Sequence, residues 1–86
     1  MENEEPFDVK LAAENLAKAE RRIALDLECL QDVRKIYEKL EKASKELPLD
    51  GEFTAVFRLR SYLAKRIGAS NQFVTEAKKM IEEAQK

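Results

Sequence analysis

The sequence predicts an all-α protein whose long N-terminal helix packs antiparallel against one broken helix or two shorter helices. Three observations support this fold class. No Gly or Pro interrupts residues 7–47, apolar side chains recur along that segment at helical spacing, and a Pro-containing turn follows it. The chain has 86 residues, so we expect a single helical domain over residues 1–86, arranged as a helical hairpin or a three-helix bundle.

The first helix is expected to run from about residue 8 to residue 46. When heptad position a is placed at Val9, ten of the twelve a and d positions are apolar, the exceptions being Asp26 and Ser44. Heptads sustained over this length are typical of a straight amphipathic helix with a seam like that of a coiled coil. Asp8 stands directly before the first apolar residue and is therefore predicted to cap the helix.

Two further helices are expected, over residues 53–67 and 70–85. Asp50 belongs to a turn sequence and can cap the first of these helices. Gly68 suits a helix C-terminus, and Ser70 can cap a restart. The predicted order is therefore a helix, a turn, a second helix, a brief break and a third helix.

The turn sequence also predicts how the helices pair. Pro48 cannot continue a helix, so the first helix ends before it. If the chain folds back at residues 47–52, the apolar stripes of the two arms coincide. In that register Ala77 lies opposite Ile23.

The composition excludes several kinds of chemistry. The chain has no His and a single Cys, Cys29, so it cannot assemble a Ser-His-Asp triad, a Cys/His zinc site or an internal disulfide. Its two Gly residues are too far apart for a phosphate-binding loop, and no apolar run is long enough to span a bilayer. A free thiol suits a reducing compartment. We therefore expect a cytoplasmic, non-enzymatic protein without a catalytic, cofactor or metal site, a small-molecule substrate or a membrane partner, and with Cys29 as a small apolar residue that is at least half-buried.

Apolar residues beside the expected seam are candidates for a binding surface. A two-helix hairpin cannot cover both flanks of its long helix, and contiguous exposed apolar area usually marks an interface. The alternative is a three-helix bundle, bent at Gly68, that covers these residues itself. The expected partner is another protein or a second copy of the chain, as in a homodimer. The predicted interface residues are Leu25, Leu27, Cys29, Ile36, Leu59 and Tyr62.

Two charged residues fall on the expected apolar faces. Asp26 occupies a d position, where a carboxylate can fix register or partner choice. We favour the other interpretation, in which the stripe shifts locally to Leu27 and Asp26 stays solvated or pairs with Arg22. Arg60 lies near the middle of the second apolar face, where it snorkels past the core edge, reaches an acidic group such as Glu41, or binds a partner.

A short motif occurs near the C-terminal end of the chain. Ala64 is followed by Gly68 after four residues and by Val74 after ten. This spacing resembles the helix-turn-helix DNA-binding motif over residues 60–79, and the resemblance implies a recognition helix that begins near Ser70. It also implies a set of DNA contacts: Arg58, Lys65 and Arg66 near the phosphates, and Asn71, Gln72, Thr75 and Lys79 toward the major groove.

The charge is unevenly divided along the chain. Residues 1–50 carry 9 basic and 13 acidic side chains, whereas residues 51–86 carry 7 basic and 4 acidic ones. A basic segment suits nucleic acid, and it equally complements an acidic helix packed against it. The function we predict is a small helical protein–protein interaction module, such as an adaptor, an inhibitor or an assembly subunit. The alternative is a dimeric helix-turn-helix DNA-binding regulator.

Overall fold

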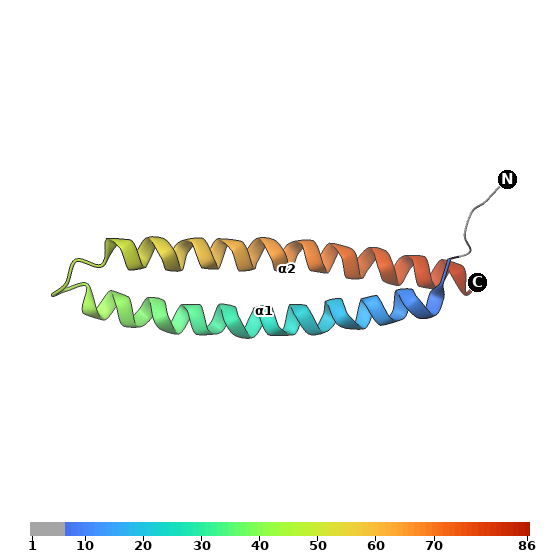
Figure 1. The fold of residues 1–86 in the computed structure, drawn as a ribbon, viewed down its shortest axis with the longest axis horizontal. Helices are drawn as coiled ribbons and strands as arrows, with labels where there is room; N and C mark the ends of the chain where they lie inside the picture. Colours follow the sequence, from blue (N-terminus) through green and yellow to red (C-terminus); the bar gives the residue numbers. More distant parts are fainter. Residues whose placement is uncertain (1–6) are drawn as a thin grey trace.

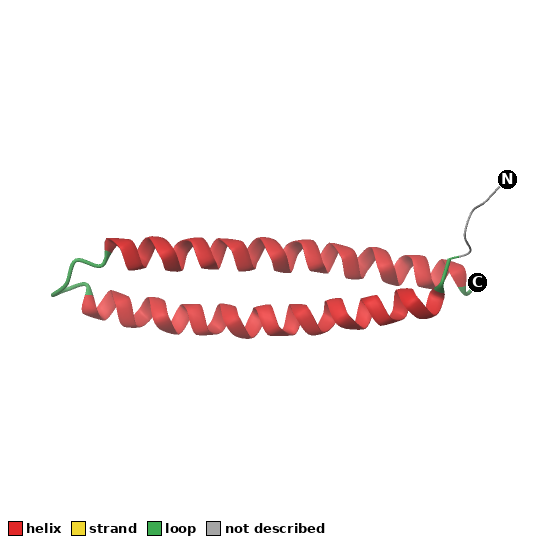
Figure 2. Ribbon diagram, in the orientation of Figure 1, coloured by secondary structure: helices red, strands yellow, loops and turns green. Residues whose placement is uncertain are grey.

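The computed structural model describes residues 7–86, which form two antiparallel helices joined by a short turn. Helix α1 spans Val9–Ala43 and helix α2 spans Asp50–Ala84. The two helices lie side by side along their length (Figure 1). The described residues contain no strand (Figure 2). The fold is therefore a helical hairpin, about 68 Å long, and these residues do not form the three-helix bundle that was the other expectation.

Helix α1 begins where the sequence predicts. The Asp8 carboxylate accepts a hydrogen bond of 3.0 Å from the N–H of Leu11, which satisfies one free donor of the first turn. The helix ends at Ala43, three residues before the expected boundary at residue 46. A tighter turn follows, because the N–H of Glu46 bonds to the Ala43 carbonyl only three residues back and Pro48 disfavours helical backbone before it.

Helix α2 is continuous where the sequence predicted two helices. Both expected boundary residues, Gly68 and Ser70, lie inside it, so the helices predicted over residues 53–67 and 70–85 are one element. A glycine inside a helix costs ~1 kcal/mol relative to alanine. The apolar stripe that packs on α1 continues past Gly68 at the same spacing, with buried residues on both sides. Packing of this stripe outweighs the local preference of glycine for a helix end.

The start of α2 also differs from the prediction. Asp50 is the first residue of the helix and not its cap. The cap position belongs to Leu49, whose side chain has no group that can accept a hydrogen bond. The helix is reinforced one turn later, where the Thr54 hydroxyl donates a hydrogen bond of 2.9 Å to the Asp50 carbonyl.

The seam between the helices follows the heptad pattern of the sequence. Val33 of α1 is buried there, as are Leu63 and Val74 of α2. Near the turn, Tyr37 packs on Phe53 with the two rings edge to face and their centroids 5.4 Å apart. The seam thus buries few large apolar side chains for a chain of this length.

The pairing of the helices differs from the predicted register by about two helical turns. Asp26 forms an ion pair with Arg66 across the seam. Ile23 lies one turn before Asp26, so it is level with the residues just after Arg66 and not with Ala77. The cause is the turn, which occupies residues 44–49 and is centred earlier than expected. Each residue by which that centre moves shifts the pairing by two residues.

Candidate functional site

A buried ion pair lies in the middle of the seam. Asp26 is only 2% exposed, and its carboxylate accepts a hydrogen bond of 2.8 Å from Nε of Arg66. The Arg66 guanidinium also donates a 3.3 Å hydrogen bond to the Tyr62 hydroxyl, and it lies 5.9 Å from the centre of the Tyr62 ring. The hydrogen bond to Tyr62, together with the charge of Asp26, raises the pKa of Arg66 above its ordinary value. A buried carboxylate needs such a partner, because a buried charge without one destabilises the folded chain.

The favoured interpretation of Asp26 is therefore wrong. The stripe does not shift to Leu27, which is 47% exposed, and Asp26 is neither solvated nor paired with Arg22. The heptad pattern placed Asp26 correctly on the seam. The helix-turn-helix resemblance, in contrast, implied that Arg66 lies near a DNA phosphate. A correct register would have identified this pair, since it puts the one acidic d position of α1 opposite a basic residue of α2.

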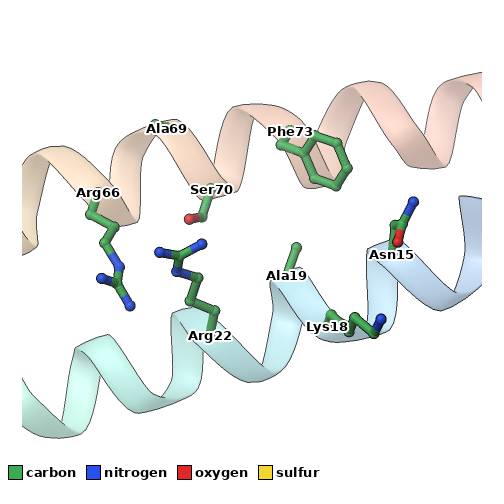
Figure 3. A pocket seen from close by; sticks show the side chains of 8 residues that line it. All are labelled: Asn15, Lys18, Ala19, Arg22, Arg66, Ala69, Ser70 and Phe73. Atoms are coloured by element: carbon green, nitrogen blue, oxygen red, sulfur yellow. The ribbon is translucent and has the colours of Figure 1, made fainter.

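One groove between the helices defines a side of the hairpin. Its lining residues come from both helices, and Arg22 and Arg66 extend into the space between them (Figure 3). Side chains seven residues apart lie on the same side of a straight helix. The groove is lined by Asn15, Lys18, Ala19, Arg22, Arg66, Ala69, Ser70 and Phe73.

Most of the predicted interface residues lie on this same side. Cys29 is seven residues beyond Arg22 and Ile36 seven beyond Cys29, while Leu25 is seven beyond Lys18. In α1, these three residues therefore continue the rows of side chains that line the groove.

The matching rows of α2 bring two more predicted residues to this side. Leu59 precedes Arg66 by seven residues, and Tyr62 precedes Ala69 by seven. We define the Cys29 face as Leu25, Cys29 and Ile36 of α1 with Leu59 and Tyr62 of α2. The four large side chains among them are between 47 and 57% exposed, and Cys29 is half-buried.

The remaining predicted residue lies on the opposite side. A second groove is lined by Arg34 and Glu41 of α1 and by Phe57 and Arg60 of α2, among others. Leu27 precedes Arg34 by seven residues and therefore belongs to this side. We call it the Phe57 face. Arg60 is exposed there and lines the same groove as Glu41, and four of the groove's eight lining residues are charged.

Two exposed residues of α2 extend the Cys29 side beyond the predicted set. Phe73 and Met80 follow Arg66 at seven-residue intervals, and both line a third groove near the start of α1. Phe7 lines that groove as well. The sequence contains these residues in a seven-residue row that begins before Gly68. The row can be recognised only if α2 is treated as one continuous helix.

The residues implied by the helix-turn-helix resemblance lie along one straight helix. Arg58, Lys65, Gln72 and Lys79 are spaced seven apart, and all four are exposed. Thr75 is tied to its own helix, because its hydroxyl donates a 3.0 Å hydrogen bond to the carbonyl of Asn71. Ser70 and Arg66 line the groove on the Cys29 side. Residues 60–79 thus belong to one continuous helix, which does not change direction at residues 68–70.

Residues 7–86 lack two other kinds of functional feature. Neither helix contains a segment long and apolar enough to cross a membrane. The same residues hold no cluster of three or more Cys, Asp or Glu side chains arranged to bind a metal ion. No protein-family model, curated protein or solved structure matches the chain.

Proposed function

We propose that this protein is a non-enzymatic interaction module of the cytoplasm that self-associates or docks on another protein through its Cys29 face. One observation carries the proposal: among the described residues, twelve large apolar side chains are exposed and only three apolar residues are buried. Burial of apolar surface is the main force that stabilises folded proteins, so a hairpin with this balance gains stability when a partner covers it.

The exposed area supports the same conclusion. The chain exposes 7093 Å². A compact monomer of its mass, 9.9 kDa, is expected to expose only about 5,200 Å². The excess of about 1,900 Å² is more than twice the ~800 Å² that each partner buries in a standard protein–protein interface. The excess is therefore large enough for one partner to bury a standard interface on one face of the hairpin.

The two faces differ in a way that favours the Cys29 side. Contiguous exposed apolar area is typical of interfaces, and charged residues are depleted at interface centres. The Cys29 face has apolar side chains from both helices at its centre, and the charged residues of its groove, Lys18, Arg22 and Arg66, lie beyond Cys29 toward the chain termini. The groove of the Phe57 face has charged residues there, including Arg34, Arg60 and Glu41.

Sedimentation and thermal unfolding over a wide range of protein concentration test this proposal. Native protein is expected to associate, with a melting temperature that rises with concentration. Leu59→Glu introduces a charge at the centre of the Cys29 face and should abolish association. Phe57→Glu is the matched control, because it places the same charge on the other face two residues away and should leave association unchanged.

The contrary outcomes are equally specific. If Phe57→Glu disrupts association and Leu59→Glu does not, the Cys29 face is the wrong surface. If native protein stays monomeric with a constant melting temperature, self-association is wrong. Random-sequence duplex DNA, added at roughly 50 and 200 mM salt, tests the alternative function. Co-sedimentation that weakens steeply with salt would favour the DNA-binding regulator.

A further inference from the structure

We infer that the groove lined by Lys18, Arg22 and Arg66 binds a small organic phosphate, with the phosphate group among these three cations and the apolar part of the ligand against Phe73. This ligand site lies beside the apolar centre of the Cys29 face, and it does not depend on the proposed function. It is carried by the charges at the groove, by the ion pairs that these charges form within residues 7–86, and by the apolar groove that continues from it.

The charge of the groove suits a doubly charged anion. Among the described residues that line it, three are cations and none is acidic: Lys18 and Arg22 come from successive turns of α1, and Arg66 comes from α2. Asp26 is buried next to the groove and paired with Arg66. Three positive charges and this negative one leave a local charge of +2. A phosphate monoester carries about −1.5 to −2 near neutral pH, so it matches this charge better than a single carboxylate does.

The cations of the groove have donors available for a ligand. The ion pairs within residues 7–86 join Arg66 to Asp26 and Lys78 to Glu20, and they include neither Lys18 nor Arg22. Arg66 uses Nε for Asp26 and Nη1 for Tyr62, so its Nη2 can donate to another acceptor. A phosphate can therefore bind here without breaking the buried pair.

Donors from the two helices face each other across the groove. Arg66 is level with Asp26, so Ser70, one turn later in α2, is level with Arg22, one turn earlier in α1. The Arg22 guanidinium points toward α2, and the Ser70 hydroxyl points toward α1 (Figure 3). Convergent guanidinium and hydroxyl donors suit the several acceptor oxygens of a phosphate group.

The groove continues into an apolar one toward the chain termini. Asn15 and Phe73 line both this groove and the third one, so the two are contiguous. Phe73 and Met80 are exposed in the third groove and provide apolar surface there. Glu76 lines the third groove as well, and its carboxylate repels an anion. These features orient the ligand, with its phosphate among the cations and its apolar part in the third groove.

The size of the site is that of a small-molecule site. The two grooves have volumes of about 460 and 220 Å³, and ligand sites typically have ~300–1,000 Å³. The groove of the Phe57 face does not share the charge of this site, because Arg34 and Arg60 are accompanied there by Glu38 and Glu41. An anion is therefore attracted to one side of the hairpin in particular.

Binding of 1-naphthyl phosphate, followed by the fluorescence anisotropy of its naphthyl group, tests this inference. The chain has no Trp, so its own fluorescence is weak. Native protein should bind 1-naphthyl phosphate, and inorganic phosphate should displace it only at much higher concentration because it lacks the apolar group. Lys18→Gln and Arg22→Gln should each weaken binding roughly tenfold, since each removes a charged donor to the phosphate.

Two further variants make the test specific. Lys39→Gln is the matched control, because it removes the same charge from the same row of α1 about 30 Å from Lys18 and should leave binding unchanged. Phe73→Ala should weaken binding of 1-naphthyl phosphate roughly fivefold and leave calorimetric binding of inorganic phosphate unchanged. Circular dichroism of every variant checks that its helix content is native.

The contrary outcomes are distinct. Failure of native protein to bind 1-naphthyl phosphate would overturn the inference. Equal losses for Lys18→Gln, Arg22→Gln and Lys39→Gln would also overturn it, because the overall charge and not the groove would then attract the ligand. If Phe73→Ala leaves binding of 1-naphthyl phosphate unchanged, the placement of the apolar part is wrong. None of these results bears on the proposed function, which the association of Leu59→Glu decides.

Discussion

The seam and the Cys29 face are built from similar rows of side chains but have different surroundings. In α2 the seam row contains Leu63 and Val74, and the neighbouring row contains Leu59, Arg66 and Phe73. The neighbouring row repeats every seven residues and the seam positions alternate steps of four and three, yet only the seam positions are covered by α1. This difference separates two roles: the seam holds the hairpin together within one chain, whereas the face depends on another molecule for its burial.

Arg66 is the residue that belongs to both regions, and removing it should have the largest effect. Arg66→Met leaves the carboxylate of Asp26 buried and without a partner, and we expect the melting temperature to fall by about 10 °C. Asp26→Leu should be nearly neutral or stabilising, because the Arg66 side chain is 27% exposed and keeps water and the Tyr62 hydroxyl as partners. Thermal unfolding followed by circular dichroism at one protein concentration measures both.

The double variant Asp26→Leu/Arg66→Met sharpens this test. It replaces the ion pair with apolar side chains and should recover most of the stability lost in Arg66→Met. Equal losses for the two single variants would show that the pair acts symmetrically, contrary to the burial of Asp26 and the partial exposure of Arg66.

A pair of leucines one turn apart tests the separation between seam and face directly. Leu63 is 5% exposed, so Leu63→Ala should lower the free energy of unfolding by ~2–5 kcal/mol at every protein concentration. Leu59 is 47% exposed, so Leu59→Ala should change stability by less than ~0.5 kcal/mol in dilute solution. Its effect should appear only as the concentration rises and native chains associate.

Chemical denaturation at several concentrations distinguishes these cases. A concentration-dependent loss for Leu63→Ala that vanishes on dilution would place Leu63 at an intermolecular contact and not in the seam. A large loss for Leu59→Ala in dilute solution would mean that Leu59 is covered within its own chain. Either result would break the distinction between the two regions.

The seam of α1 could be predicted from the sequence because many residues report on it together. Its heptads alone place Val33 and Asp26 between the helices, as the structure does. The register depended instead on where two helix ends lie, and local signals define such ends poorly. Errors of three residues at Ala43 and at Asp50 acted in the same direction, so the pairing moved by two turns.

The candidate surface was predicted in part for the same reason. Five of the six predicted residues share the Cys29 face, because exposure beside a seam follows from the heptads. Leu27 lies on the other face, since adjacency to the seam does not distinguish its two sides. The Asp26–Arg66 pair could not be found without the register. The break expected at Gly68 was a local preference that the packing of the whole helix overrides.

Gly68 also provides the prediction with the smallest effect, at a position outside both the seam and the face. Gly68→Ala should raise the free energy of unfolding by ~0.5–1 kcal/mol, because alanine restricts the unfolded chain and favours helix. An added Cβ meets no atom within 4 Å, and the backbone there is not in the left-handed region. Chemical denaturation of the variant measures this gain. If residues 68–70 instead formed the turn of a helix-turn-helix with glycine in a left-handed conformation, the same change would destabilise the protein, so the sign of the effect distinguishes a continuous α2 from a bent one.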